Sequence, residues 1–365
     1  MKVEVAIVGN GVAGYACAAR LAKHGIRPLL IGPGLPVDRP PLTKNALAKG
    51  ELVLLADAQR LEERGIATLD AHVDAADLAA MRLVAGGEEL EADAIVLATG
   101  LSYRPPPVPG LEIAHVNATP GGMRRLAAAL AGRSRRVAVI GAGLIGVETA
   151  ATLATGGHEV TLLDLLERPF DRLHDPLPGL AAATLAELGI RFVGGAGIHQ
   201  VIAADELVTV CYEGGSVAAD VVVAATGGRF VSPPGLELAG PLEVGADMAV
   251  PGHEGVYLVG DLVLVPHTLY GSIRFPHWDA AIGTGEQAAD AIAGVAGSYE
   301  RLPYWWSDVG PRRFAEVGWS GAAATWNDED GLHVGRGSGG RAVAVLVVDE
   351  PRRLREARAL VHSST

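Results

Sequence analysis

The stretch GAGLIGVETAATLATGGHEVTLLD, residues 141–164, has the layout of a dinucleotide-binding unit, and GNGVAGYACAARLAKHGIRPLLIGP, residues 9–33, repeats that layout near the N-terminus. In both stretches an apolar segment precedes three glycines spaced G-x-G-x-x-G, and helix-forming residues follow. A single such turn is a weak signal, because glycine-rich turns are also common for structural reasons. Two turns in the same strand–turn–helix context predict an α/β chain with two dinucleotide sites.

Each glycine of these turns has its own physical role. The first permits the tight turn, the second lets the backbone approach a pyrophosphate, and the third lets the helix pack on the strand. The phosphates then lie at the helix N-terminus, where free N–H groups and the helix dipole favour negative charge. The predicted cofactor-binding glycines are Gly9, Gly11 and Gly14 in the first unit and Gly141, Gly143 and Gly146 in the second.

The hydrophobic pattern around the turns predicts the neighbouring elements. Three further apolar runs, AIVLATG, VVVAATG and GVYLVGD, each read as a buried strand that ends in a small-residue turn. The last of them places Asp261 at the carboxyl edge of a strand, beside a cofactor crevice. We expect strands over 3–8 and 136–140, strands that end in turns within 94–100, 221–227 and 255–261, and helices over 15–23 and 147–154.

The two units differ where each should end in an acid. Twenty-three positions after the first glycine, the second unit has Asp164, which we expect to accept hydrogen bonds from the ribose hydroxyls of NADH and to repel a 2′-phosphate. Arg168, four residues further on, could soften this preference for NADH, but a solvated loop arginine is the simpler interpretation. The first unit has Gly32 at the equivalent position, so adenosine there must be held by another group, such as Asp38 or backbone.

Composition narrows the class of protein. The chain has 365 residues, 49% of them hydrophobic, and a net charge of −12, which argues against non-specific nucleic-acid binding. Cys17 and Cys211 provide no disulfide framework, Cys-x-x-Cys pair or metal set, so redox chemistry must belong to an organic cofactor. We predict no metal site, no membrane-spanning segment, no signal peptide and a cytoplasmic location. Two dinucleotide sites suggest two different cofactors, and the usual pair is a tightly held flavin and a diffusing nicotinamide coenzyme.

Several motifs, in order along nearly the whole chain, resemble the FAD-dependent ferredoxin reductases. They are DRPPLTK at 38–44, the second glycine unit with Glu148, Gly260-Asp261, RFPHWDAAIGTG at 274–285 and LPYWWSD at 302–308. The resemblance implies that Arg39 and Lys44 lie along FAD, and that Glu148 pairs with Lys44 near the reactive flavin nitrogen as the catalytic pair. It also implies that Asp261 holds the ribityl chain and that Trp278 abuts the ring.

The chain departs from the family pattern at two positions. Pro276 replaces a glutamate that the family has in the RFPHWD segment, and Tyr304 stands where the family often has a tryptophan against the flavin. Trp306 keeps its place.

The resemblance also implies the organisation of the chain. Residues 1–110 and 230–297 would form the FAD domain, 111–229 the inserted NAD domain, and 298–365 a small α/β interface domain. In that last part RAVAVLVVD predicts a strand and PRRLREARALV a closing helix. An acidic partner would need a cationic patch, for which the candidates are Arg312, Arg313, Arg352, Arg353 and Arg355.

The leading hypothesis is an NADH-dependent FAD enzyme, monomer or homodimer, that passes electrons to a ferredoxin-type iron–sulfur protein of an oxygenase system. A stand-alone flavin oxidoreductase acting on a small metabolite is the alternative. A non-catalytic regulatory flavoprotein is a third hypothesis. Dithiol reductases are disfavoured, because residues 38–44 contain no cysteine.

Overall fold

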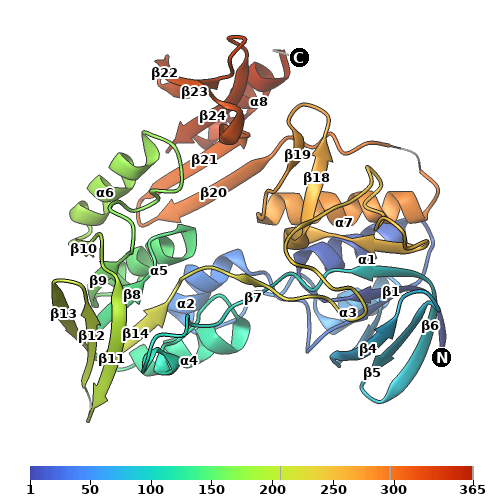
Figure 1. The fold of residues 1–365 in the computed structure, drawn as a ribbon, viewed down its shortest axis with the longest axis horizontal. Coiled ribbons are helices and arrows are strands. Elements are labelled where there is room, and N and C mark those ends of the chain that lie inside the picture. The colour runs from blue at the N-terminus through green and yellow to red at the C-terminus, as the bar shows by residue number, and fades with distance from the viewer. Residues whose placement is uncertain (206, 296, 364–365) are drawn as a thin grey trace.

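The computed structural model describes residues 1–205, 207–295 and 297–363, which form an α/β protein with a parallel sheet on each side and an antiparallel sheet at the C-terminal end (Figure 1). The predicted fold class is therefore confirmed. Within the described residues, no helix is both long enough and apolar enough to cross a membrane.

The first sheet has the strand order β3-β2-β1-β6-β5-β4, with β17 also paired to β6. Pairing is parallel from β3 to β6 and to β17, whereas β4, β5 and β6 form an antiparallel extension. Helices α1 and α7 pack together over this sheet (Figure 1). The elements are β1 (Lys2–Val8), α1 (Val12–Lys23), β2 (Pro28–Ile31), η1 (Pro40–Thr43), α2 (Asn45–Lys49), α3 (Ala58–Glu63), β3 (Ala67–Leu69), β4 (Val73–Asp77), β5 (Arg82–Ala85), β6 (Glu88–Leu97), β17 (Val256–Leu258), η3 (Gly260–Leu262) and α7 (Trp278–Ile292).

The second sheet is wholly parallel, in the order β10-β9-β8-β14. A small antiparallel sheet of β11, β12 and β13 lies beside it. The chain enters this part after β7 and leaves it through β15, and these two short strands pair with each other. The elements are β7 (Leu101–Ser102), η2 (Leu111–Ile113), α4 (Pro120–Leu130), β8 (Arg136–Ile140), α5 (Leu144–Thr155), β9 (Glu159–Leu163), α6 (Leu177–Glu187), β10 (Arg191–Val193), β11 (Ile198–Ala204), β12 (Leu207–Tyr212), β13 (Gly215–Ala219), β14 (Val221–Ala224) and β15 (Arg229–Phe230).

The C-terminal sheet is antiparallel, in the order β20-β21-β24-β23-β22, and α8 packs on β24 and β21. Trp305, Phe314 and Leu346 of this sheet belong to the same apolar core as the second parallel sheet, so the two are packed together. The elements are β20 (Tyr304–Val309), β21 (Arg312–Gly318), η4 (Ser320–Ala322), β22 (Thr325–Glu329), β23 (Leu332–Arg336), β24 (Ala342–Val348), η5 (Pro351–Arg353) and α8 (Leu354–Ser363). A separate three-stranded sheet, in the order β16-β18-β19, consists of β16 (Leu242–Glu243), β18 (Val263–His267) and β19 (Gly271–Ile273).

Both predicted strand–turn–helix units are present, but their helices begin earlier than predicted, at Val12 and Leu144. The reason is that the third glycine of each turn lies inside the first helical turn and packs against the carbonyl of the first glycine. The predicted C-terminal strand and helix are confirmed as β24 and α8. The other strands of that sheet were missed.

The glycine turns generate a test of folding. A Cβ on Gly146 would lie 1.8 Å from the Gly141 carbonyl oxygen, whereas a Cβ on Gly143 would meet nothing within 4 Å. We therefore expect Gly146→Ala to lower the free energy of unfolding by about 3 kcal/mol or more. Gly143→Ala, the matched control, should lower it by less than about 1 kcal/mol. Urea unfolding followed by circular dichroism measures both, and equal losses would contradict this account of the turn.

Candidate active site

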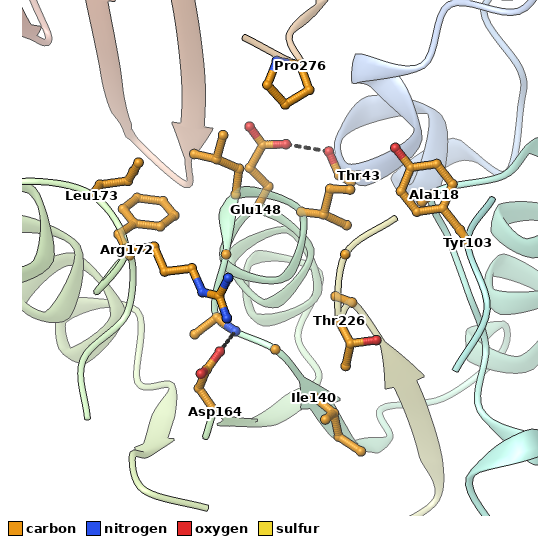
Figure 2. A pocket seen from close by; sticks show the side chains of 18 of the residues that line it. Thr43, Tyr103, Ala118, Ile140, Glu148, Asp164, Arg172, Leu173, Thr226 and Pro276 are labelled. Carbon is orange, nitrogen blue, oxygen red and sulfur yellow. Dashed lines mark hydrogen bonds between the residues drawn. The ribbon is translucent and has the colours of Figure 1, made fainter. Parts of the chain in front are cut away.

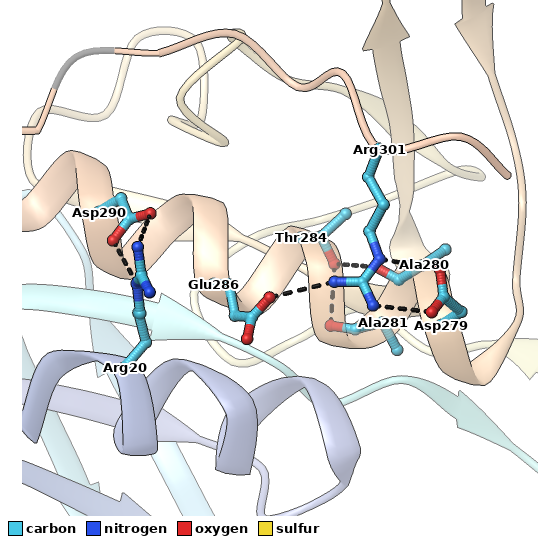
Figure 3. Close-up of polar contacts among 8 residues, drawn as sticks. All are labelled: Arg20, Asp279, Ala280, Ala281, Thr284, Glu286, Asp290 and Arg301. Atoms are coloured by element: carbon cyan, nitrogen blue, oxygen red, sulfur yellow. Dashed lines mark hydrogen bonds and ion pairs between the residues drawn. The ribbon is translucent and has the colours of Figure 1, made fainter. Parts of the chain in front are cut away.

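A cavity of about 860 Å³ lies between the two parallel sheets (Figure 2). Its wall combines η1 from the first unit, the glycine turn and β9 end of the second unit, the start of α7, and β20 of the C-terminal sheet. Four segments that are far apart in the sequence therefore meet at one cavity.

The two glycine turns leave the ends of their helices open. Gly11 and Gly143 are the N-terminal caps of α1 and α5, and a Cβ on either would meet no atom within 4 Å. Gly9 and Gly141 have φ values of +113° and +102°, which disfavour residues other than glycine. An unobstructed helix N-terminus fits a pyrophosphate, so both turns suit a dinucleotide.

Asp164 lies directly after β9 and lines the cavity. Its carboxylate accepts hydrogen bonds from the N–H groups of Ala142, in the glycine turn, and Leu166. Arg168 is held by Asp171 and Asp175, at 2.8 and 3.0 Å.

Arg172, which the sequence did not single out, extends along the cavity wall toward Asp164 (Figure 2). Within the described part of the chain it makes no ion pair. Its position after Asp164 carries no pattern from which its orientation could be predicted.

In the first unit, where Gly32 replaces the expected acid, the amide side chain of Asn10 occupies the nearby space. A Cβ on Gly32 would lie 2.6 Å from Cγ of Asn10, so the Asn10 side chain fills the space where a longer side chain would stand. Asn10 Nδ2 donates to the carbonyls of Pro33 and Gly34 at 3.0 and 2.9 Å. The nearby carboxylate is that of Asp70, which accepts the Gly34 N–H at 2.9 Å.

Asp70 follows β3, the next parallel strand, and the sequence hypothesis overlooked it. Asp38, the suggested alternative, is instead engaged by Trp278, whose Nε1 donates to its carboxylate at 2.8 Å.

Lys44 and Glu148 form an ion pair at the centre of the cavity wall. Lys44 Nζ lies 3.1 Å from Glu148 Oε1 and 3.2 Å from Asp308 Oδ2. Glu148 is only 8% exposed at its side chain, and it also accepts hydrogen bonds from Thr43 Oγ1 at 2.5 Å (Figure 2) and from Ser307 Oγ at 2.8 Å. Burial raises the pKa of Glu148, and Lys44 and the two hydroxyls oppose that rise.

Asp261 lies in η3 after β17 and also lines the cavity. Desolvation raises the pKa of Asp261, and the nearby cations Arg39 and Arg274 work against that rise. A partly buried carboxylate that lines the cavity is suited to accept hydrogen bonds from a polar ligand.

Aromatic side chains form the remaining wall. Trp278 begins α7 and meets Trp306 edge to face at 5.6 Å between ring centroids. Tyr304 does not line the cavity, because its ring is stacked on Trp306 and covered by the Arg358 guanidinium.

Pro276 and His277 lie beside this aromatic wall. Pro276 faces the Glu148–Thr43 hydrogen bond (Figure 2). His277 lies in the RFPHWD segment, and no role was predicted for it from the sequence. Burial lowers the pKa of His277 to about 4, so the imidazole that lines the cavity is neutral at physiological pH.

The charged and aromatic groups of the cavity wall suit electron transfer between two planar ligands. Cys17 is buried away from the cavity wall, and burial raises the pKa of its thiol. Among residues 1–205, 207–295 and 297–363, no cluster of three or more His, Cys, Asp or Glu side chains could hold a metal ion. Lys44 is a shielded cation where both units meet, with its Nζ atom 5.8 Å from the centroid of the Trp306 ring.

Comparison with known proteins agrees with this geometry. The family model for pyridine nucleotide-disulphide oxidoreductases matches residues 3–285, which include both glycine turns. The ferredoxin reductase component of chlorobenzene dioxygenase from Cupriavidus sp. is 32% identical, with 99% of this chain and 94% of that protein covered. Rhodocoxin reductase from Rhodococcus erythropolis is 28% identical, with 98% and 89% covered. The solved ferredoxin reductase of the CYP199A2 system from Rhodopseudomonas palustris has a TM-score of 0.86 at 25% identity, with 95% and 91% covered.

Lys44→Met tests the buried pair through stability. Because the folded-state pKa of Glu148 is raised, its stabilising contribution is present at low pH and lost as pH rises through that pKa. Removing Lys44 raises this pKa further, so the variant's deficit should be small at acidic pH and reach about 3 kcal/mol at alkaline pH. Urea unfolding at several pH values measures it. Lys44→Met/Glu148→Gln should recover most of the loss, and a deficit independent of pH would contradict the pairing.

Proposed function

This chain belongs to the pyridine nucleotide-disulphide oxidoreductase family, within its ferredoxin reductases, and we propose that it takes hydride from NADH through FAD and reduces a ferredoxin-type iron–sulfur protein. Flavin and a nicotinamide coenzyme follow from the family, while FAD, NADH and the acceptor are part of the proposal. A bound flavin would supply the redox chemistry, since it accepts a hydride as a pair and releases electrons singly.

The Lys44–Glu148 pair is the observation that supports this function most strongly. Lys44 comes from the first unit, Glu148 from the second, and Asp308 and Ser307 from the C-terminal sheet. We propose these residues as the catalytic pair with its supports. Lys44 would place positive charge where negative charge develops during hydride transfer, and Glu148 would fix Lys44 in that position.

We propose that the remaining predicted residues bind the two cofactors. The α1 turn, with Gly9, Gly11 and Gly14, would hold the FAD pyrophosphate, with Arg39, Asp261 and Trp278 along the flavin. The α5 turn, with Gly141, Gly143, Gly146 and Asp164, would hold NADH. The open helix ends at both turns support this assignment.

The division of the chain belongs to the same proposal. Residues 1–110 and 230–297 would form the FAD domain, 111–229 the NAD domain and 298–365 the interface domain. The pairing of β7 with β15, where the chain crosses twice between the two parallel sheets, supports these boundaries. A cytoplasmic location is also proposed, and the free state of Cys17 and Cys211 is compatible with a reducing compartment.

The acceptor would bind through a small cationic patch. Of the five candidate arginines, Arg312 pairs with Asp349 at 2.8 Å, Arg313 with Asp308 at 2.9 Å and Arg353 with Glu356 at 2.9 Å. Arg352 and Arg355 are exposed and make no ion pair within the part of the chain that the structure describes. We propose these two arginines as the free charge that attracts an acidic partner.

Asp164 should set coenzyme preference. We expect NADH to be preferred over NADPH by at least about tenfold in kcat/KM, equivalent to about 1.4 kcal/mol. Asp164→Ser should narrow that ratio, because the carboxylate would no longer accept the ribose hydroxyls or repel a 2′-phosphate. Arg168→Gln is the control, since Asp171 and Asp175 already hold Arg168. A ratio unchanged in Asp164→Ser would show that Asp164 does not contact the ribose.

Reversing the free charges tests the protein acceptor. The purified protein should be yellow, should be bleached by NADH without oxygen, and should then reduce an acidic ferredoxin faster than it reduces oxygen. Arg352→Glu/Arg355→Glu should slow ferredoxin reduction about tenfold at low salt and leave reduction of a small dye unchanged. Arg60→Glu/Arg82→Glu changes the net charge equally on exposed residues of the first unit and serves as the control.

Parallel loss of dye and ferredoxin activities would contradict the docking patch. If no ferredoxin is reduced by the intact protein while a small molecule is, the chain acts as a stand-alone flavin oxidoreductase. If NADH does not bleach the flavin, the regulatory, non-catalytic role is favoured.

A further inference from the structure

The segment of residues 165–176, between Asp164 and α6, has one side on the cavity. Leu165, Phe170, Arg172 and Leu173 all line that cavity, and Arg172 extends toward Asp164 (Figure 2). The segment therefore lines the same cavity as the glycine turn that precedes α5. Its position decides where Arg172 stands relative to any dinucleotide bound there.

The other side of this segment is fixed to the C-terminal sheet. His174 Nε2 lies 2.5 Å from Glu316 Oε2, and the His174 ring is stacked on Trp326 with centroids 3.7 Å apart and planes 4° apart. Phe170 meets Phe314 edge to face at 6.3 Å. Phe314 and Glu316 are alternate residues of β21, so one strand face provides both attachments.

Glu316 is a carboxylate in an apolar position. It is 1% exposed, and the residues opposite it on the neighbouring strands are Trp305 and Leu346. Besides His174 it accepts only the Ser320 N–H, at 3.3 Å, among the described residues. A buried carboxylate without a strong partner destabilises a fold, so Glu316 depends on His174.

His174 is well suited to this role. Its Nδ1 lies 3.0 Å from the Asp175 carbonyl oxygen, while its Nε2 faces Glu316. Both ring nitrogens thus lie within hydrogen-bond distance of an oxygen atom. The face of the ring is covered by the stacked Trp326 side chain. Two perpendicular restraints, one in the ring plane and one on its face, leave the segment little freedom.

We propose that His174 is a positioning residue for the nicotinamide coenzyme: anchored to Glu316 and Trp326, it holds the 165–176 segment and Arg172 against the dinucleotide. This inference rests on the proposed binding of NADH at the α5 turn. It gives the C-terminal sheet a part in coenzyme affinity, separate from the docking of an acceptor. The interaction does not involve the Lys44–Glu148 pair.

The test measures binding to the holoenzyme without turnover. ADP-ribose, which has the adenosine and pyrophosphate of NADH but no nicotinamide, is titrated into wild type and His174→Ala by calorimetry. We expect Kd to rise about fivefold or more, with an equal rise in the KM for NADH and a kcat changed less than about twofold. Flavin content should be unchanged. His333→Ala, on β23 of the same sheet, is the matched histidine control and should bind as wild type does.

Second variants keep the test independent of folding defects. Glu316→Gln retains the shape of the side chain, and Trp326→Leu removes the stack from the other side. A Kd for ADP-ribose within about twofold of wild type in His174→Ala would overturn the inference. It would also be overturned if the loss of binding free energy in the His174→Ala/Glu316→Gln double variant equalled the sum of the losses in the two single variants. Wild-type protein that does not bind ADP-ribose would instead overturn the proposed function, on which the inference depends.

Discussion

The buried contact between Lys44 and Glu148 is the constraint on which the arrangement of this protein depends. Three parts of the chain must meet for it to form, because Asp308 and Ser307 of the C-terminal sheet complete the shell around the pair. A carboxylate as enclosed as Glu148 is tolerated only while its donors are in place. The position of each parallel sheet and of the C-terminal sheet is thus tied to one charged centre between the proposed cofactor sites.

A second buried carboxylate, on the same face of the C-terminal sheet as Ser307, is restrained in the same way. Glu316 is even more deeply buried than Glu148, and its partner also comes from a distant segment, through His174. Both carboxylates lie where the C-terminal sheet packs on the second parallel sheet, with which it shares an apolar core. Apolar packing supplies the area of that contact, and the two buried pairs fix its register.

The sequence was most informative where function needs a local pattern. The spacing of glycines predicted both turns because a tight turn, a phosphate approach and a helix contact recur at fixed positions. It failed where the partner is distant. Nothing near Gly32 indicates that the Asn10 amide fills its space. Asp171 and Asp175 are close to Arg168 in sequence, but they lie in a loop, which has no periodicity from which these ion pairs or the position of Arg172 in the cavity wall could be predicted. The strand β20 was missed because its sequence, YWWSDV, does not alternate between polar and apolar residues, although its burial does: the polar Ser307 is buried between Trp305 and Val309. The sequences of β22 and β23, TWNDE and LHVGR, show no regular alternation either.

The account makes Lys44 and its partners the place where hydride passes directly between the two proposed cofactors. Anaerobic rapid mixing with NADH, followed at the flavin absorbance, tests this most directly when NADH deuterated at the transferred position is compared with ordinary NADH. The account predicts complete bleaching at a rate at least equal to turnover, slowed by a primary isotope effect. Bleaching that is absent, or much slower than turnover, would contradict it.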